Sequence, residues 1–289
     1  MMQLAKITRF IFCAGLLAVF VPQVQADELS QMISPLSHPT NFEDPRIISE
    51  LRPIYAYHEI DNDFVTAGGD VQLYALQARF ALSDDLAFIA TKDGYIDFNP
   101  DANVPKDEGF ADIALGFKYA LHQDRELGEI LTAGLRYEIP LGDEDVFQGE
   151  GDGEINPFLS GAIALGNFNV MAGTGFRLRL DQDDSSFYDF DVQVNYEVGN
   201  FYPLVEFGLV HVLSAGNRLP IKAEGQDLFN FGSSQSDGET IVTTTVGGRY
   251  RITEDIDIGA GYQFPLTSGV GSSIIDYRVY ADMIFRFDI

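Results

Sequence analysis

Residues capable of nucleophilic or acid–base chemistry are few in this sequence and lie far apart. The histidines are His38, His58, His122 and His211, and the only cysteine is Cys13. A hydrolase needs a nucleophile, a base and an orienting group together. His211 falls on an apolar face near Ser214, and no acidic third member accompanies the two. We therefore expect no catalytic residue, no cofactor and no enzymatic activity.

An acidic, glycine-rich segment at 142–154 is a weak candidate for metal binding. The candidate ligands are Asp143, Asp145 and Asp152, because Ca²⁺ and Mg²⁺ prefer oxygen ligands such as carboxylates. Phe147, however, stands where a calcium loop places another ligand, and Gly149 is out of register. We interpret the segment as a solvated loop without a metal site, with weak divalent binding that bridges lipopolysaccharide as the alternative.

Many other charged residues alternate with apolar ones. In 277–289, for example, Arg278, Asp282 and Arg286 share one face, while the other face is apolar. A period of two is typical of a β-strand with two different faces. The charged residues predicted on the polar faces, and so inside a barrel, are Arg79, Asp112, Lys118, Arg136, Glu138, Arg177, Arg179, Asp189, Asp191, Glu206, Arg249, Arg251, Asp257, Arg278, Asp282 and Arg286.

Some of these charges are predicted to pair across strands. A hairpin centred near residue 184 sets Arg179 opposite Asp189 and Arg177 opposite Asp191. The same counting sets Arg251 opposite Asp257. Opposite charges in such positions stabilise a sheet by about 0.2–1 kcal/mol per pair. The charges either line a wet pore or form neutralised ladders that fill the barrel; we favour a narrow passage.

Twelve such runs occupy the chain from residue 51 onward. They cover roughly 51–60, 70–82, 86–97, 109–121, 128–140, 155–165, 168–181, 187–198, 201–213, 240–252, 256–266 and 275–289. Every second connection is short, and the others are mostly longer, up to 214–239. This sorting is typical of outer-membrane barrels, whose sheets must close because hydrocarbon leaves no backbone group unpaired. The sequence predicts an all-β, twelve-stranded antiparallel up-and-down transmembrane barrel with short periplasmic turns and longer extracellular loops.

Two segments precede the predicted barrel of 51–289. Residues 1–26 have the basic, apolar and small-residue regions of a secretory signal peptide. Residues 27–50 contain three prolines and no clear period, which indicates an extended periplasmic lead-in able to enter the lumen as a constriction or plug. With the signal, the barrel indicates the outer membrane of a Gram-negative cell.

The predicted partners follow from charge and from the barrel surface. A formal net charge of −26 opposes binding to nucleic acid. The apolar outer face requires contact with outer-membrane lipid and lipopolysaccharide. The alternating terminal strand has the form of a signal for the barrel-assembly machinery, although it ends in Ile289 rather than an aromatic residue. The protein is expected as a monomer or homo-oligomer.

The stretch 109–121, GFADIALGFKYAL, resembles the Gly-x-x-Asp-x-x-x-x-x-Lys-Tyr strand of the family described as "MetA-pathway of phenol degradation". Residues 135–142 are similar to its strand that ends in Pro-x-Gly, and the hairpin 156–168 follows in the family's order. The match covers roughly 70–289. This resemblance implies an outer-membrane barrel assigned to transport, and it assigns no binding residue here.

These observations predict a passive channel or facilitator for small solutes, with aromatic or apolar solutes among the candidates. Two alternatives stay open at this point. One is a surface enzyme that modifies lipid, and the other is a structural or adhesive barrel whose lumen is sealed.

Overall fold

The computed structural model describes residues 27–288. The predicted signal peptide at 1–26 and the terminal Ile289 lie outside the described residues. Within residues 27–288, helical structure is limited to α1 (Glu28–Gln31) and to the short 3₁₀ turns η1 (Glu144–Val146) and η2 (Val270–Ser272). No helix among the described residues has the length and apolar character needed to cross a membrane.

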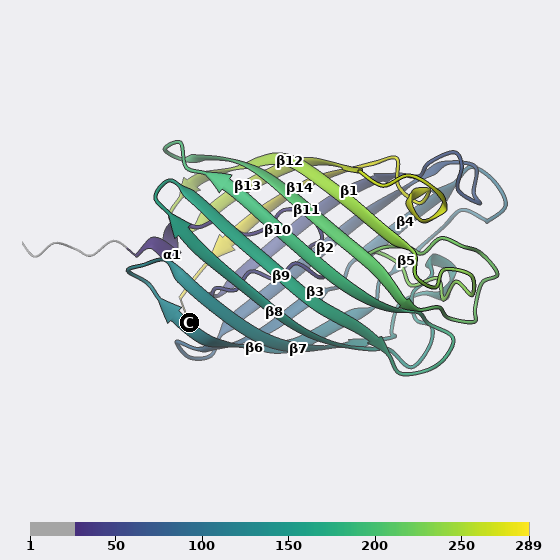
Figure 1. Ribbon diagram of the computed structural model, residues 1–289, viewed down its shortest axis with the longest axis horizontal. Helices are drawn as coiled ribbons and strands as arrows, with labels where there is room; N and C mark the ends of the chain where they lie inside the picture. The colour runs from purple at the N-terminus through teal and green to yellow at the C-terminus, as the bar shows by residue number, and fades with distance from the viewer. Residues whose placement is uncertain (1–26, 289) are drawn as a thin grey trace, which may run out of the picture.

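Antiparallel strands form one closed sheet around a central axis (Figure 1). The strands are β1 (Glu50–Glu59), β2 (Gly69–Ala81), β3 (Leu86–Lys92), β4 (Tyr95–Pro100), β5 (Asp107–Phe110), β6 (Ile113–Asp124), β7 (Glu129–Ile139), β8 (Glu154–Leu165), β9 (Phe168–Arg179), β10 (Ser186–Tyr196), β11 (Phe201–Ser214), β12 (Thr240–Thr253), β13 (Ile256–Pro265) and β14 (Tyr277–Arg286). Closure comes from β1, which pairs with both β2 and β14. A closed sheet has no edge with unpaired backbone groups.

Two of the barrel strands are interrupted. β3 and β4 follow one another along β2, and β5 and β6 together form the next barrel strand. Gly94 marks the first interruption: its φ is +128°, and a Cβ there would lie 2.6 Å from the Tyr74 carbonyl oxygen. With each interrupted pair taken as one, the barrel has twelve strands, which confirms the prediction.

The connections sort by length between the two ends of the barrel. One end, here called the turn end, carries tight connections such as Gly166-Asn167, where Gly166 has a φ of +66°. The other end, the loop end, carries the long connections, among them 140–153, 215–239 and 266–276. Figure 1 shows α1 at the turn end and the long loops at the opposite end. The predicted sorting is therefore confirmed.

The two faces of the barrel have opposite chemistry. On β9, Phe176 and Leu178 are 44% and 40% exposed on the outside, whereas Arg177 between them is 6% exposed on the inside. Aromatic pairs lie on the outer surface, such as Tyr55 with Tyr74, whose ring centroids are 5.3 Å apart. An apolar belt with aromatic residues suits a lipid environment, whereas a soluble barrel has its apolar face inside.

The register of the β9–β10 hairpin differs from the prediction. Arg177 lies opposite Phe187, and Asp189 lies opposite Gly175. The reason is the Asp181 turn, in which the Asp181 side chain accepts the backbone N–H groups of Asp183 and Asp184 and shifts the centre of the hairpin toward residue 182. By contrast, Arg251 lies opposite Asp257 as predicted, with 3.2 Å between Nε and Oδ1.

Candidate functional site: the barrel interior

Residues 27–49, here called the N-terminal segment, run inside the barrel from the turn end and return to β1. Figure 1 shows this part of the chain as the dark purple trace within the barrel. Ser34, Ser37, Glu43 and Asp44 are each at most 2% exposed. The segment therefore occupies part of the barrel interior, for which the sequence allowed either a wet pore or neutralised charge ladders.

Backbone carbonyls of the segment face β2, β6 and β7. Gln77 Nε2 donates to the Pro39 carbonyl at 2.7 Å, and Lys118 Nζ donates to the Asp44 carbonyl at 2.6 Å. Arg136 donates to the carbonyls of Thr40 and Asn41. Because these donors bind peptide oxygens, these contacts depend on the backbone conformation of the N-terminal segment and not on the identity of its side chains.

A carboxylate of the segment meets two cations of the same wall. Glu43 Oε1 and Oε2 accept from Arg79 Nε at 2.7 Å and Arg79 Nη2 at 2.8 Å. Lys118 Nζ donates to Glu43 Oε1 at 2.8 Å. Arg79 also contacts Glu50, at the start of β1, at 3.0 Å. A two-point guanidinium–carboxylate contact is among the strongest hydrogen-bonding arrangements in proteins.

The opposite wall presents carboxylates to donors of the segment. Glu206 on β11 accepts the backbone N–H groups of Leu36 and Ser37, both at 2.7 Å. His38 Nδ1 lies 2.6 Å from Asp191 Oδ1 on β10. The segment thus meets cations on one side and anions on the other.

Nearer the turn end, Arg249 links the segment to β14. Its Nε and Nη2 donate to the Ser34 and Pro35 carbonyls at 2.7 Å and 2.9 Å. Its Nη1 and Nη2 also contact Asp282, which is shared with Arg52. Since Arg249 is fully buried, these contacts satisfy its charge inside the barrel.

At the loop end, apolar groups close the interior. Five phenylalanines from four different connections or strands form the aromatic lid: Phe64, Phe98, Phe147, Phe229 and Phe231. Asp227, from the 215–239 loop, pairs with Arg278 at 2.7 Å. The Asp227 carbonyl also accepts from Thr40 Oγ1 at 3.3 Å, so the loop touches the tip of the N-terminal segment.

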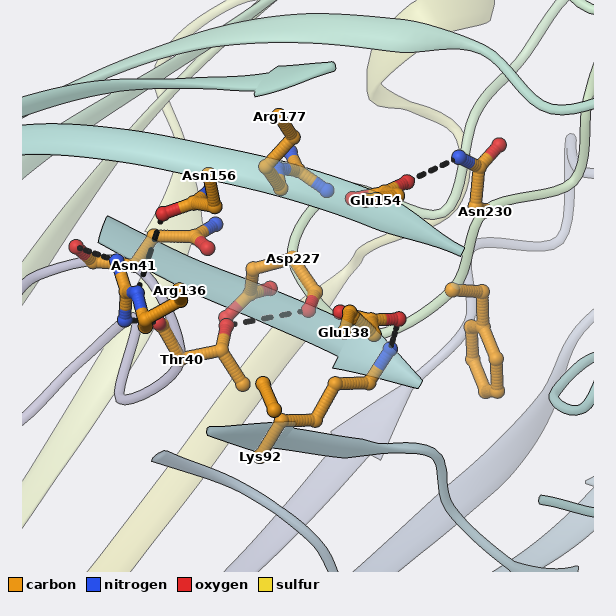
Figure 2. A pocket seen from close by; sticks show the side chains of 12 residues that line it. Thr40, Asn41, Lys92, Arg136, Glu138, Glu154, Asn156, Arg177, Asp227 and Asn230 are labelled. Carbon is orange, nitrogen blue, oxygen red and sulfur yellow. Dashed lines mark hydrogen bonds and ion pairs between the residues drawn. The ribbon is translucent and has the colours of Figure 1, made fainter. Parts of the chain in front are cut away.

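A small polar cavity stays open between the segment tip, the lid and the β7–β9 wall (Figure 2). Its volume is about 20 Å³, enough for about one water molecule. Lys92 pairs there with Glu138, and Asn230 donates to Glu154. A second cavity of about 20 Å³ shares these four residues and extends toward Arg218. Each of these two cavities is large enough for about one water molecule.

The remaining predicted interior residues lie as follows. Asp189 binds Arg177 diagonally at 2.9 Å, and Asp257 contacts both Arg251 and Arg286. Arg179 is half-buried and donates to the Ala215 carbonyl, not to Asp189. Asp112 accepts the backbone N–H groups of Gly142 and Gly149 at the base of a loop.

Sequence reasoning missed several residues that take part in this interior. Arg52, Lys92 and Glu154 lie on strands, where the period-two pattern contains the signal that would have identified them. Asp227 lies in a loop without any period, so no sequence signal marked it. The segment's own Glu43 and His38 were likewise unmarked, because their role depends on where the segment lies.

The predicted loop and histidine positions show the following geometry. Asp143 Oδ2 accepts the Phe110 N–H at 2.6 Å, and Asp145 and Asp152 are exposed. Between residues 27 and 288, no three histidine or acidic side chains converge as metal ligands would. His211 lies on the outer side of β11 and contacts Thr240 Oγ1 at 2.7 Å.

The Asp184 carboxyl at the loop end is a weaker acid than usual. Burial raises the pKa of Asp184 to about 7, against the opposing effect of Arg218, and Asp181 adds to the rise. Arg218 contacts both Asp184 and Glu150 and also donates to the Asn230 carbonyl at 3.0 Å. Asp184 therefore lies in the contact that joins the 180–185 turn to the 215–239 loop.

No family model and no curated protein matches this sequence. Among solved structures, an outer membrane channel from Pseudomonas putida F1 shares 14% identity, covers 89% of this chain and 100% of its own, and has a TM-score of 0.61. The NanC porin shares 11% identity over 83% of this chain and 100% of its own, with a TM-score of 0.51. These likenesses establish the outer-membrane barrel fold.

Proposed function

We propose that the protein is a passive channel for small solutes in the outer membrane of a Gram-negative cell. The turn end faces the periplasm and the loop end faces the exterior, as in other barrels of this fold. Membership of the phenol-degradation family, which rests on 109–121 and its neighbouring motifs, is part of this proposal. Lipid and lipopolysaccharide surround the apolar outer face, and the barrel-assembly machinery inserts the chain.

The observation that carries the proposal is how the N-terminal segment is held. Its contacts with the wall include many hydrogen bonds and ion pairs, such as those of Arg136, Arg249 and Glu206, beside buried apolar side chains such as Leu36 and Phe42. Water can replace the polar contacts at a net change in free energy of about 0.5–1.5 kcal/mol per neutral hydrogen bond and about 1.5–3 kcal/mol where a charged group takes part. A segment tethered at one end and held in this way can leave the lumen.

The polar cavities of the β7–β9 side mark the solute route past the aromatic lid. They are lined mainly by charged and amide side chains, including Lys92, Glu138 and Asn230, and each also borders one phenylalanine of the lid, Phe229 in the first and Phe147 in the second (Figure 2). With the segment displaced, this side of the barrel is the polar path between the two ends. A structural barrel with a permanently sealed lumen is the competing function, and a measurement of conductance distinguishes the two.

Planar-bilayer recording separates the two functions. Purified full-length protein and a variant without residues 29–48 are compared, after heat-modified electrophoretic mobility has verified that both barrels are folded. We expect rare, small openings for the full-length protein and a several-fold larger, persistent conductance for the deletion variant. A folded deletion variant that carries no current would overturn the channel proposal in favour of the sealed barrel.

A further inference from the structure

The contact between Glu43 and the wall has the form of a ligand-binding site. Glu43, Arg79 and Lys118 are each about 1% exposed, and both carboxylate oxygens of Glu43 are bound. The two cations come from β2 and β6, whereas the carboxylate comes from a segment joined to the barrel by its far end. A rigid wall thus holds the receptor groups, and a detachable chain supplies the ligand group.

The number of positive and negative charges around Arg79 and Lys118 shows which charge a ligand must carry to replace Glu43. With Glu43 in place, Arg79 and Lys118 face two carboxylates, those of Glu43 and Glu50. Without it, only Glu50 remains, so one positive charge is uncompensated. Arg136 adds to the excess, because its hydrogen bonds go to Asn156, Thr91 and carbonyls of the segment, all of them neutral. This wall then attracts an anion.

The wall formed by β10 and β11 needs hydrogen-bond donors or positive charge instead. Glu206 and Asp191 find their donors in Leu36, Ser37 and His38, all within the segment. β10 and β11 lie across the barrel from β2 and its neighbour β3–β4. Displacement of the segment therefore leaves a lumen with a positive and a negative side, in which a carboxylate is drawn to the Arg79 side.

We propose that Arg79 and Lys118 form a binding site for the carboxylate of small organic acids, which Glu43 occupies in the closed state. A solute carboxylate competes with Glu43 and binds only when the segment is displaced. By linkage, a ligand that binds one state alone increases that state's population by a factor of 1 + [L]/Kd. This inference rests on the proposed function, because it makes small acids the solutes and the signal for opening.

Binding is tested without reference to conduction. In detergent-solubilised E43A the site has lost its resident carboxylate, and the probe is trifluoroacetate observed by ¹⁹F NMR. We expect E43A to broaden the trifluoroacetate resonance, and the wild type to broaden it less. The control E144A, which removes an exposed loop carboxylate instead, should behave as the wild type does. The triple variant E43A/R79Q/K118Q should cause no broadening. Trifluoroacetamide, the neutral analogue, is expected to show no broadening with any of them.

Gating is tested with the full-length wild type in planar bilayers. Acetate at ten times its Kd is expected to increase the open population about tenfold over chloride at equal ionic strength, and acetamide is expected to leave it unchanged. E43Q is expected to open more often than the wild type, whereas E144Q, the same change at an exposed loop carboxylate, is expected to open as the wild type does.

The two proposals fail in different ways. If E43A broadens trifluoroacetate no more than the triple variant does, or if acetate opens the wild-type channel no more than acetamide does, the carboxylate site is overturned while the conductance of the deletion variant still supports the channel. If E43A binds trifluoroacetate but the deletion variant carries no current, the binding site stands, and both the channel and the solute-driven opening are overturned.

Discussion

The two halves of the barrel interior are closed by different forces. At the turn end, the N-terminal segment is bound through its carbonyls and charges, with Arg249, Lys118 and Glu206 as partners, and also through buried apolar side chains such as Phe42. At the loop end, the aromatic lid packs ring against ring, with 5.1 Å between the centroids of Phe147 and Phe231.

This difference indicates which half moves. Hydrogen bonds inside a wettable lumen exchange with water at little net cost, whereas exposure of a buried phenylalanine costs about 1.5–3 kcal/mol. The segment buries Phe42 as well, but it joins a barrel strand only at β1, whereas the lid comes from a strand and from connections that join strands at both ends. We therefore expect the N-terminal segment to be the more movable part of the closure. The predictions below alter one half while the other serves as its reference.

The largest effect is expected in the lid. Replacement of both Phe229 and Phe231 with alanine removes two rings that are 1% and 2% exposed. Large-to-small changes of this kind cost about 3–5 kcal/mol each. We expect a clear fall in the thermal midpoint of the heat-modified mobility shift. F110A, whose ring is 65% exposed on the outer face, serves as control, and an equal effect of F110A would contradict a packed lid.

A smaller effect is expected from R249M in the other half. The variant leaves the Ser34 and Pro35 carbonyls without their donor and leaves Asp282 with Arg52 alone. Loss of one partner from a buried charge pair costs about 3–5 kcal/mol, and we expect the lower limit because Arg52 stays. Hydrogen exchange should accelerate in residues 29–45 while the lid keeps its protection. Unchanged exchange in the segment would show that other contacts hold it.

The junction of the 180–185 turn with the 215–239 loop should respond to pH. The pKa of Asp184 is raised from 3.8 to about 7 in the folded loop, so the folded state binds this proton more tightly than the unfolded chain does. Stability from this group is therefore present below about pH 4 and is lost as pH rises through 7.

Hydrogen exchange of residues 215–239, corrected for the intrinsic pH dependence, is the measurement for this group. Protection is expected to fall between pH 5 and pH 8 in the wild type and to vary less in D184N. An identical pH profile in D184N would assign the effect to another group.

The smallest effect is expected for D27N at the entrance of the turn end. Arg125 contacts Asp27 at 2.8 Å, but both side chains are substantially exposed, 51% and 35%. Exposed ion pairs contribute about 0–1 kcal/mol, so the thermal midpoint and the conductance should stay close to wild type. A large increase in opening would show that the segment is anchored at its entrance rather than along its length.

The sequence alone was sufficient to predict the barrel, because its signal is local. A period of two in segments such as 277–289 follows from the geometry of a single strand. The alternation of short and long connections along the chain likewise required no knowledge of contacts. Closure then followed from the absence of hydrogen-bonding partners in lipid.

Register and pairing were less predictable. Arg251 and Asp257 are joined by a short turn, so counting placed them correctly. Arg177 and Asp191 are separated by a longer loop whose Asp181 turn shifts the register, so counting failed. The centre of this hairpin lies two residues from the predicted one, so every partner is displaced by four positions while each side chain keeps its predicted face.

The sequence by itself determined which side chains face inward, since alternation fixes the face of each strand residue. Only the tertiary structure decided which residues those side chains contact. Glu43 lies 36 residues before Arg79 and 75 before Lys118, in a segment without any period. Contacts over such separations arise from where the closed barrel confines the chain, and no local pattern in the sequence encodes that confinement.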